Sequence, residues 1–139
     1  MRYRFASSDD IPLLSRMNHS LIRDEGHRNT MSIVELEQRM VAWLQGEYDA
    51  IVFEDERGAA GYVLFRREPE WIYLRQFFVV PERRRKGVGA AAVGWLLANA
   101  WKESPRIRLD VLVGNAAGAR FWRSLGFADY CITMERRVE

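Results

Sequence analysis

Residues 79–89, Val-Val-Pro-Glu-Arg-Arg-Arg-Lys-Gly-Val-Gly, join an apolar stretch of the chain to a helical pattern. The stretch that leads into them, residues 77–80, is aromatic and β-branched, which is typical of a strand. The motif Arg84-x-x-Gly87-x-Gly89 therefore lies at a strand-to-helix junction. Glycine lets the backbone approach a ligand closely, and the unpaired N–H groups and positive dipole end of a first helical turn favour phosphate oxygens. This stretch predicts a binding site for an anionic cofactor.

The same segment allows two other interpretations. Glycine pairs also form ordinary turns, and a run of cations such as residues 83–86 is typical of a solvated face or of a nucleic-acid patch. The segment is not a Walker loop, because no Gly-Lys-Ser/Thr ends it. A P-loop nucleotide triphosphatase is therefore not expected.

Composition restricts the class of protein further. A chain of 139 residues with 48% hydrophobic side chains fits a single domain over residues 1–139. The formal charge is only +2, so the basic character is local and a nucleic-acid partner is not expected. Cys131 is the sole cysteine, which fits a reducing compartment, and we expect it to be a small, half-buried strand residue. The charged N-terminus lacks the apolar core of a signal peptide and no apolar run could span a bilayer, so the sequence predicts a cytoplasmic protein without a membrane partner.

Hydrophobic periodicity predicts an α/β domain with a mixed sheet. Ser32 and Glu35 form a capping-box pattern that opens the second of the expected helices. The expected strands are residues 2–6, 48–54, 60–67, 71–80, 107–113 and one or two strands within 127–137; the expected helices are residues 9–24, 33–44, one after Gly87, and 115–124.

A second motif lies near the end of the chain. Asn115 stands where a strand is expected to end and a helix to begin, so its amide can both cap the helix and face a ligand. Phe121-Trp122-x-x-Leu125-Gly126-Phe127 follows it. Together with Val79-x-Pro81 and Arg84-x-x-Gly87-x-Gly89, this pattern resembles the GNAT superfamily of acyl-CoA-dependent N-acetyltransferases over essentially the whole chain. The resemblance implies an α/β (α+β) fold, with a central mixed, mostly antiparallel sheet of six or seven strands and about four helices. It also implies that acetyl-CoA is the cosubstrate and that a primary amine attacks it directly in a ternary complex.

The resemblance also assigns the coenzyme site. The strand before the loop would pair its backbone with pantetheine, and the loop amides would hold the pyrophosphate. Asn115 would contact the coenzyme near its pantetheine or pyrophosphate arm, and Trp122 stands where many members carry a tyrosine beside the departing thiolate. The cofactor-binding residues so assigned are Phe77, Phe78, Val79, Arg84, Arg85, Lys86, Gly87, Val88, Gly89, Ala90, Asn115 and Trp122.

Two catalytic groups common in the family are replaced in this chain. Trp122 cannot shuttle a proton at neutral pH, and Arg75-Gln76 stand where related enzymes have an acidic pair. A thiol of pKa about 8.5 needs only about 2 kcal/mol to ionise at pH 7, so an acid is dispensable. Deprotonating a lysine-like amine costs about 4.6 kcal/mol, but deprotonating an α-amine near pKa 7.8 costs about 1 kcal/mol. The sequence therefore favours a low-pKa amine or a proton relayed by water.

Substitute acid–base groups are expected near the thioester. The polar segment 24–29 joins the first two helices, and in this fold that connection covers the acceptor site; an ordinary exposed loop is the alternative. Glu25 and His27 are the candidate bases, and Tyr130 is a candidate acid or orienting group. No residue is assigned as a metal ligand.

Several functional alternatives remain open. The acceptor could be a small-molecule amine or a protein N-terminus, and a homodimer is compatible with the sequence. A domain that binds or senses acyl-CoA without chemistry is the second hypothesis, because of Trp122 and Arg75-Gln76. A nucleic-acid-binding module that uses residues 83–86 is the third.

Overall fold

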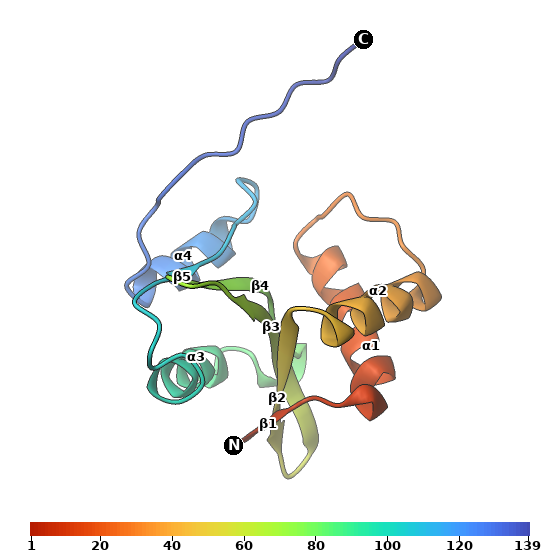
Figure 1. Cartoon of the computed structure of the whole chain (residues 1–139), viewed down its shortest axis with the longest axis vertical. Helices are drawn as coiled ribbons and strands as arrows, with labels where there is room; N and C mark the ends of the chain where they lie inside the picture. The colour runs from red at the N-terminus through yellow and green to blue at the C-terminus, as the bar shows by residue number, and fades with distance from the viewer.

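A computed structural model describes residues 1–139 as one five-stranded sheet with two helices on each face (Figure 1). The strands lie in chain order, and all neighbours are antiparallel except β4 and β5, which are parallel. The elements are β1 (Arg2–Phe5), α1 (Ile11–Asp24), α2 (Ile33–Gln45), β2 (Tyr48–Asp55), β3 (Gly58–Arg67), β4 (Ile72–Val79), α3 (Val88–Ala98), β5 (Ile107–Arg108) and α4 (Ala116–Ser124). The mixed, mostly antiparallel sheet and the four helices confirm the predicted fold class.

Local signals set the helix ends where the sequence predicts them. The Ser32 hydroxyl accepts from the Glu35 N–H and the Glu35 carboxylate accepts from the Ser32 N–H, which is the predicted capping box at the start of α2. Asn115 caps α4 by accepting from the N–H of Gly118. None of the helices has the length and apolar character that crossing a bilayer requires.

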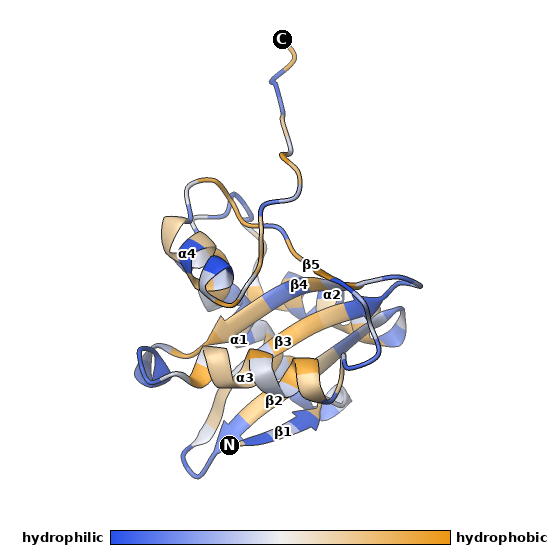
Figure 2. Cartoon of the chain, turned by 90° about the vertical axis from the view of Figure 1, so that its left-hand side faces the viewer, coloured by the Kyte–Doolittle hydropathy of each residue, from blue (hydrophilic) through white to orange (hydrophobic).

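The central strands are buried on both faces because helices cover the sheet on each side. In β2, Ala50 and Val52 point into a core with α1 and α2, whereas Ile51 and Phe53 point into a second core with α3. The middle parts of β2 and β3 are therefore apolar on both faces, and only their ends are hydrophilic, as Figure 2 shows.

The sheet has five strands rather than the predicted six or seven. Only Ile107 and Arg108 of the expected strand 107–113 pair with β4, and the expected strand or strands within 127–137 do not form. Residues 128–139 instead extend beyond the sheet and form no backbone hydrogen bond (Figure 1). Side chains alone contact this segment, in the ion pairs of Arg123 with Asp129 and of Arg28 with Glu135. The prediction that Cys131 is a half-buried strand residue is likewise wrong, because this segment has no neighbouring strand and Cys131 is exposed. Alternation in sequence specifies an extended shape, but it does not specify a partner.

The end of β4 is shaped by two departures from regular pairing. Arg75 is a bulge residue, because Gln76 pairs with Leu64 whereas Leu74 pairs with Phe65. The parallel ladder to β5 stops after Tyr73, so β4 has no strand on that side from Leu74 onward. This unpaired edge leads directly into the glycine loop.

Candidate coenzyme and acceptor site

The loop between β4 and α3 presents a run of free backbone donors. The N–H groups from Arg85 through Ala90 form no backbone hydrogen bond, and the first bond of the helix runs from Ala91 N–H to the Gly87 carbonyl. Arg85 and Gly87 both have left-handed backbone conformations, with φ of 62° and 78°. Left-handed residues turn successive N–H groups toward a common concavity, which suits an anion. The residues predicted to hold pyrophosphate therefore have the required donors available.

Arginine side chains anchor this loop to the sheet and to α1. Arg83 is 9% exposed by its side chain and donates two hydrogen bonds of 2.7 Å to Asp55, which hold the pKa of Asp55 well below its usual range. Arg84 donates from Nε to the Val79 carbonyl at 2.8 Å and from Nη2 to Asp24 at 2.6 Å. The structure therefore places the Arg84 guanidinium against α1, and only Arg85 and Lys86 of the four cations form no ion pair.

An aromatic cluster joins the two sequence motifs. Gly89 lies so close to α4 that a Cβ there would be 3.1 Å from the Phe121 ring. Phe77 of β4 stacks on Phe121 at 6.0 Å between ring centroids, and Trp122 meets Phe77 edge to face at 5.2 Å. Trp122 also packs against Phe127, so its indole is part of a half-buried apolar cluster beside the end of β4.

Asn115 lies at the start of α4 with its side chain folded over the first turn. Its amide packs so closely on Gly118 that a Cβ at residue 118 would overlap it. The predicted capping role is confirmed by the hydrogen bond to the Gly118 N–H at 3.0 Å.

The segment 24–29 brings one of its two candidate bases toward the sheet. Gly26, with φ of 65°, closes α1, and the His27 N–H donates to the Ile22 carbonyl in a Schellman arrangement. Glu25 is half-buried, and desolvation together with the charge of Asp24 raises its pKa. Its own charge acts on the buried Tyr62 of β3, whose pKa is raised chiefly by burial.

The other two catalytic candidates lie elsewhere. His27 is exposed, and its Nδ1 accepts from the Asn29 N–H at 3.2 Å, so it bonds within its own loop. Tyr130 is 78% exposed and lies beside Arg108, 4.8 Å from ring centroid to guanidinium. Tyr62 takes a position that sequence reasoning missed, because its hydroxyl donates to Gln76 Oε1 at 2.7 Å. Its alternating position in β3 gave no signal beyond core packing.

A group of cationic and aromatic side chains lies between α2 and β4. The guanidiniums of Arg39 and Arg75 both lie over the Trp43 ring, at 4.4 and 4.8 Å from its centroid. Arg75 also donates to the Tyr48 hydroxyl at 3.3 Å. The i, i+4 spacing of Arg39 and Trp43 was the only sequence signal for this cluster, because its other members come from separate elements.

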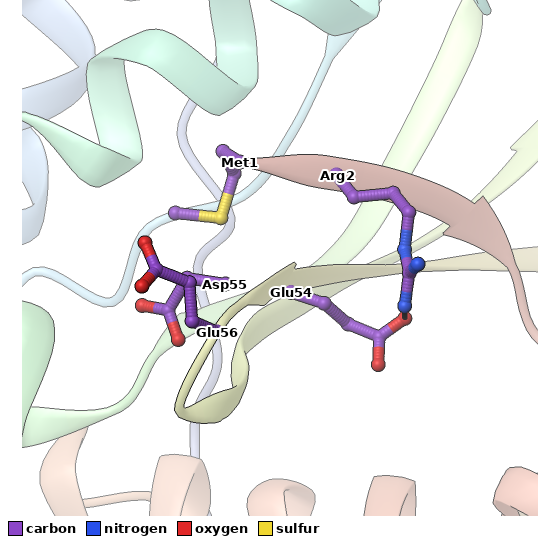
Figure 3. Close-up of a pocket in the computed structure, with 5 residues that line it drawn as sticks. All are labelled: Met1, Arg2, Glu54, Asp55 and Glu56. Carbon is purple, nitrogen blue, oxygen red and sulfur yellow. Dashed lines mark hydrogen bonds and ion pairs between the residues drawn. The ribbon is translucent and has the colours of Figure 1, made fainter.

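A surface hollow lies away from these groups. Met1, Arg2, Glu54, Asp55 and Glu56 line it (Figure 3). Glu54 is bound by Arg2 and Arg4, and Asp55 by Arg83, so both carboxylates are already neutralised. We assign no function to this hollow.

Comparison with known proteins decides the family. The sequence profile of the acetyltransferase (GNAT) family matches residues 14–127, which is well over half of the chain. The chain belongs to this family. No curated protein matches it significantly.

Solved structures of the same fold cover the chain almost completely. A possible acetyltransferase from Clostridium difficile 630 has a TM-score of 0.82 at 17% identity, with 99% of this chain and 98% of that chain covered. A variant of the BH1408 protein from Bacillus halodurans has a TM-score of 0.78 at 23% identity over 100% of both chains. The aminoglycoside N-acetyltransferase AAC(6')-Iy in complex with CoA has a TM-score of 0.78 at 14% identity, with 99% of this chain and 93% of that chain covered. At these identities the likeness establishes the shared fold.

Proposed function

We propose that residues 1–139 form a single N-acetyltransferase domain that moves the acetyl group of acetyl-CoA to a primary amine. The free N–H groups from Arg85 through Ala90 at the start of α3 carry this proposal, because they match the needs of a pyrophosphate. Family membership supports acetyl transfer in general. The unpaired edge of β4 at Phe77, Phe78 and Val79 would take the pantetheine arm, and Asn115 and Trp122 would lie along it.

The acceptor nitrogen would attack the thioester carbonyl in a ternary complex. A new C–N bond forms, the C–S bond breaks, and the electron pair of that bond leaves on the CoA sulfur. The proton lost by the nitrogen would pass to Glu25, directly or through water, because burial raises the pKa of this carboxyl and suits it to act as a base. His27 and Tyr130 are the weaker candidates, since both are exposed. Trp122 would pack against the leaving group without a proton role.

Calorimetry with CoA tests the coenzyme site. Gly87→Glu and Gly89→Glu each place negative charge and bulk at the loop and should abolish micromolar binding. Gly94→Glu is the matched control, because residue 94 lies further along α3, where a Cβ would have no atom within 4 Å, and it should bind CoA as the wild type does. Unchanged CoA affinity in both loop variants, with the fold intact, would refute the site.

An amine panel tests the chemistry. Acetyl-CoA, the protein and candidate amines should release free thiol steadily, and mass spectrometry should find the acetylated amine. A domain that only binds acyl-CoA is the alternative, favoured by the aromatic packing of Trp122 and by Arg75-Gln76. It would bind CoA with no thiol release from any amine. A nucleic-acid module is disfavoured, because Arg83 and Arg84 are held by Asp55 and Asp24.

A further inference from the structure

The guanidinium groups of Arg39 and Arg75 both lie over the Trp43 ring, and neither has a carboxylate partner. Neither forms an ion pair, whereas the nearby Arg66 is bound by Glu68 at 2.6 Å. Arg39 donates to Asn18 Oδ1 at 3.1 Å, and its Nε is buried without any partner. Desolvation and the charge of Arg75 both lower the pKa of Arg39, so its charge is poorly compensated. An anion near both groups would satisfy the free donors and relieve the like-charge repulsion.

Arg39 and Arg75 lie beside β4, on the face of the sheet where the acceptor is proposed to bind. Arg75 is the bulge residue of β4 and directly precedes Gln76, which binds the Tyr62 hydroxyl. Arg39 donates to Asn18 of α1, Glu25 follows the last residue of that helix, and the buried face of α1 packs with Tyr62 in one core. A base and a pair of cations therefore share one face of the sheet beside the end of β4.

We propose that the acceptor carries an oxyanion, a carboxylate or a phosphate, which Arg39 and Arg75 bind while its amine faces Glu25. This proposal rests on the proposed acetyltransferase function and narrows its substrate class. Guanidinium binds planar or tetrahedral oxyanions through paired N–H donors, and Trp43 holds both guanidiniums in place by cation–π contact. A cationic polyamine acceptor would need an acidic side chain at this position of β4, and the chain has Arg75 there instead.

Matched acceptor pairs test this proposal. Each of a series of amino acids is compared with its carboxamide, and phosphoethanolamine with ethanolamine. With concentrations expressed as unprotonated amine, the anionic member of the favoured pair should have a kcat/KM at least about tenfold higher, which is the usual effect of a charge-assisted hydrogen bond. The pair that shows the preference distinguishes a carboxylate from a phosphate. Equal or better turnover of all neutral members would overturn the oxyanion proposal and leave the acetyltransferase function standing.

Substitutions test whether Arg39 and Arg75 cause the preference for the anionic acceptor. Arg39→Gln and Arg75→Gln should each remove most of the preference, chiefly through KM, because the contact is present in ground state and transition state alike. Arg67→Gln is the control, since Arg67 also lies over an aromatic ring, Phe65, but on the α3 side of the sheet. It should keep the preference. A preference that survives in both Gln variants would refute their role.

Binding measurements separate this proposal from the proposed function. If no amine is acetylated although CoA binds, the acetyltransferase proposal fails. Calorimetry of the same amino acids and phosphoethanolamine with the CoA-bound protein then decides the oxyanion site. Binding that is weakened about tenfold by Arg39→Gln and not by Arg67→Gln supports the site, whereas no binding of any anionic probe refutes it.

A second, independent observation concerns the exposed C-terminal segment, residues 128–139. Its larger apolar residues stand at even-numbered positions, and Tyr130, Ile132, Met134 and Val138 are 78%, 77%, 84% and 95% exposed. None of its backbone groups has a backbone partner. An extended, unpaired, half-apolar segment is a template for another strand.

We infer that this segment pairs antiparallel with the same segment of a second copy, centred on Thr133. Side chains directly opposite must share a face, so only registers that keep the apolar residues together are allowed. Centring on Thr133 places Asp129 opposite Arg137 and Ile132 opposite Met134. Centring on Ile132 or on Met134 would instead place Asp129 opposite Glu135 or Glu139, which repel it.

Cysteine cross-linking tests both the partner and the register. In a Cys131→Ser background, Thr133→Cys should give an intermolecular disulfide readily, because residue 133 faces its own copy. Ile132→Cys and Met134→Cys should cross-link at least about tenfold more slowly. Light scattering should find a dimer that Ile132→Lys converts to a monomer, and the exposed position of Ile132 leaves the folded body untouched. A wild-type monomer, or faster cross-linking at 132 or 134, would overturn this inference.

Discussion

Replacing Gly87 by alanine isolates the backbone strain at the start of α3. Gly87 has φ of 78°, and a Cβ at that position would have no atom within 4 Å, so no steric contact confuses the result. A non-glycine residue in the left-handed region costs about 1–2 kcal/mol. Alanine also reduces the entropy of the unfolded chain, which offsets about 0.4–1 kcal/mol of that cost. The net loss of stability should be about 1 kcal/mol.

Thermal unfolding measures this loss. An unfolding entropy of about 2.1 cal/mol/K per residue gives about 0.29 kcal/mol/K for 139 residues, so Tm should fall by about 3–4 °C. Gly87→Asn should lose about half as much, because asparagine tolerates the left-handed region. Gly94→Ala should have the opposite effect, since Gly94 lies inside α3 with open space around it. There alanine gains about 0.5–1 kcal/mol and raises Tm by about 2–3 °C.

The changes in Tm of Gly87→Ala and Gly94→Ala together test whether residue 87 has a left-handed backbone. If Gly87→Ala raises Tm as Gly94→Ala does, then residue 87 is helical and the loop does not turn its N–H groups toward a common point. CoA calorimetry on the same variants provides the functional reading. The affinity should fall in Gly87→Ala more than in Gly87→Asn, and Gly94→Ala should match the wild type.

Substitutions at Trp122, Glu25 and Asp55 probe the rest of the site. Trp122→Phe should lower turnover by about tenfold or less, and Trp122→Tyr should raise it by restoring a donor, whereas a thousandfold loss in a folded Phe variant would show that the indole N–H is essential. Glu25→Gln should lower kcat/KM and remove the acidic limb of its pH profile, with CoA affinity unaltered. Because the folded-state pKa of Glu25 is raised, the stability of the wild type falls as pH rises through that pKa. Chemical denaturation at neutral pH should therefore find the Gln variant to be the more stable protein. Asp55→Asn should be less stable than the wild type at pH 7, and the difference should shrink below about pH 4, because the lowered pKa of Asp55 contributes stability that is lost as pH falls; equal denaturation midpoints at pH 7 would contradict this.

The sequence predicted those elements whose signals are local. The capping box of α2 lies within four residues, and the start of α3 at Gly87 and the cap of α4 at Asn115 likewise depend on adjacent residues. Strands β2, β3 and β4 were each predicted from one apolar run, within two residues of their observed ends. These features need no knowledge of distant contacts.

Features that depend on distant contacts could not be predicted. The end of the β4–β5 ladder after Tyr73 and the unpaired state of residues 128–139 are set by which strands meet in space. The bulge at Arg75 is a register shift against β3, which the sequence of β4 alone does not reveal. The grouping of Arg39 and Arg75 on Trp43 needs α2 and β4 to pack together, so no single motif could indicate it.

The positive charge of Arg75 at the β4 bulge explains why the proposed base, Glu25, lies at the end of α1 and not on β4. A carboxylate placed beside Arg75 would be stabilised in its charged form, and its lowered pKa would make it a weak base. Glu25 lies instead at the end of α1, where desolvation and Asp24 raise its pKa toward the operating range of a general base. We therefore propose that this chain separates two tasks that an acidic pair on β4 would combine. Arg75 and Arg39 orient the acceptor through its anion, and Glu25 removes the proton. If this division is correct, Arg75→Glu should not restore a faster enzyme; it should repel the anionic acceptor and raise its KM by more than Arg75→Gln does.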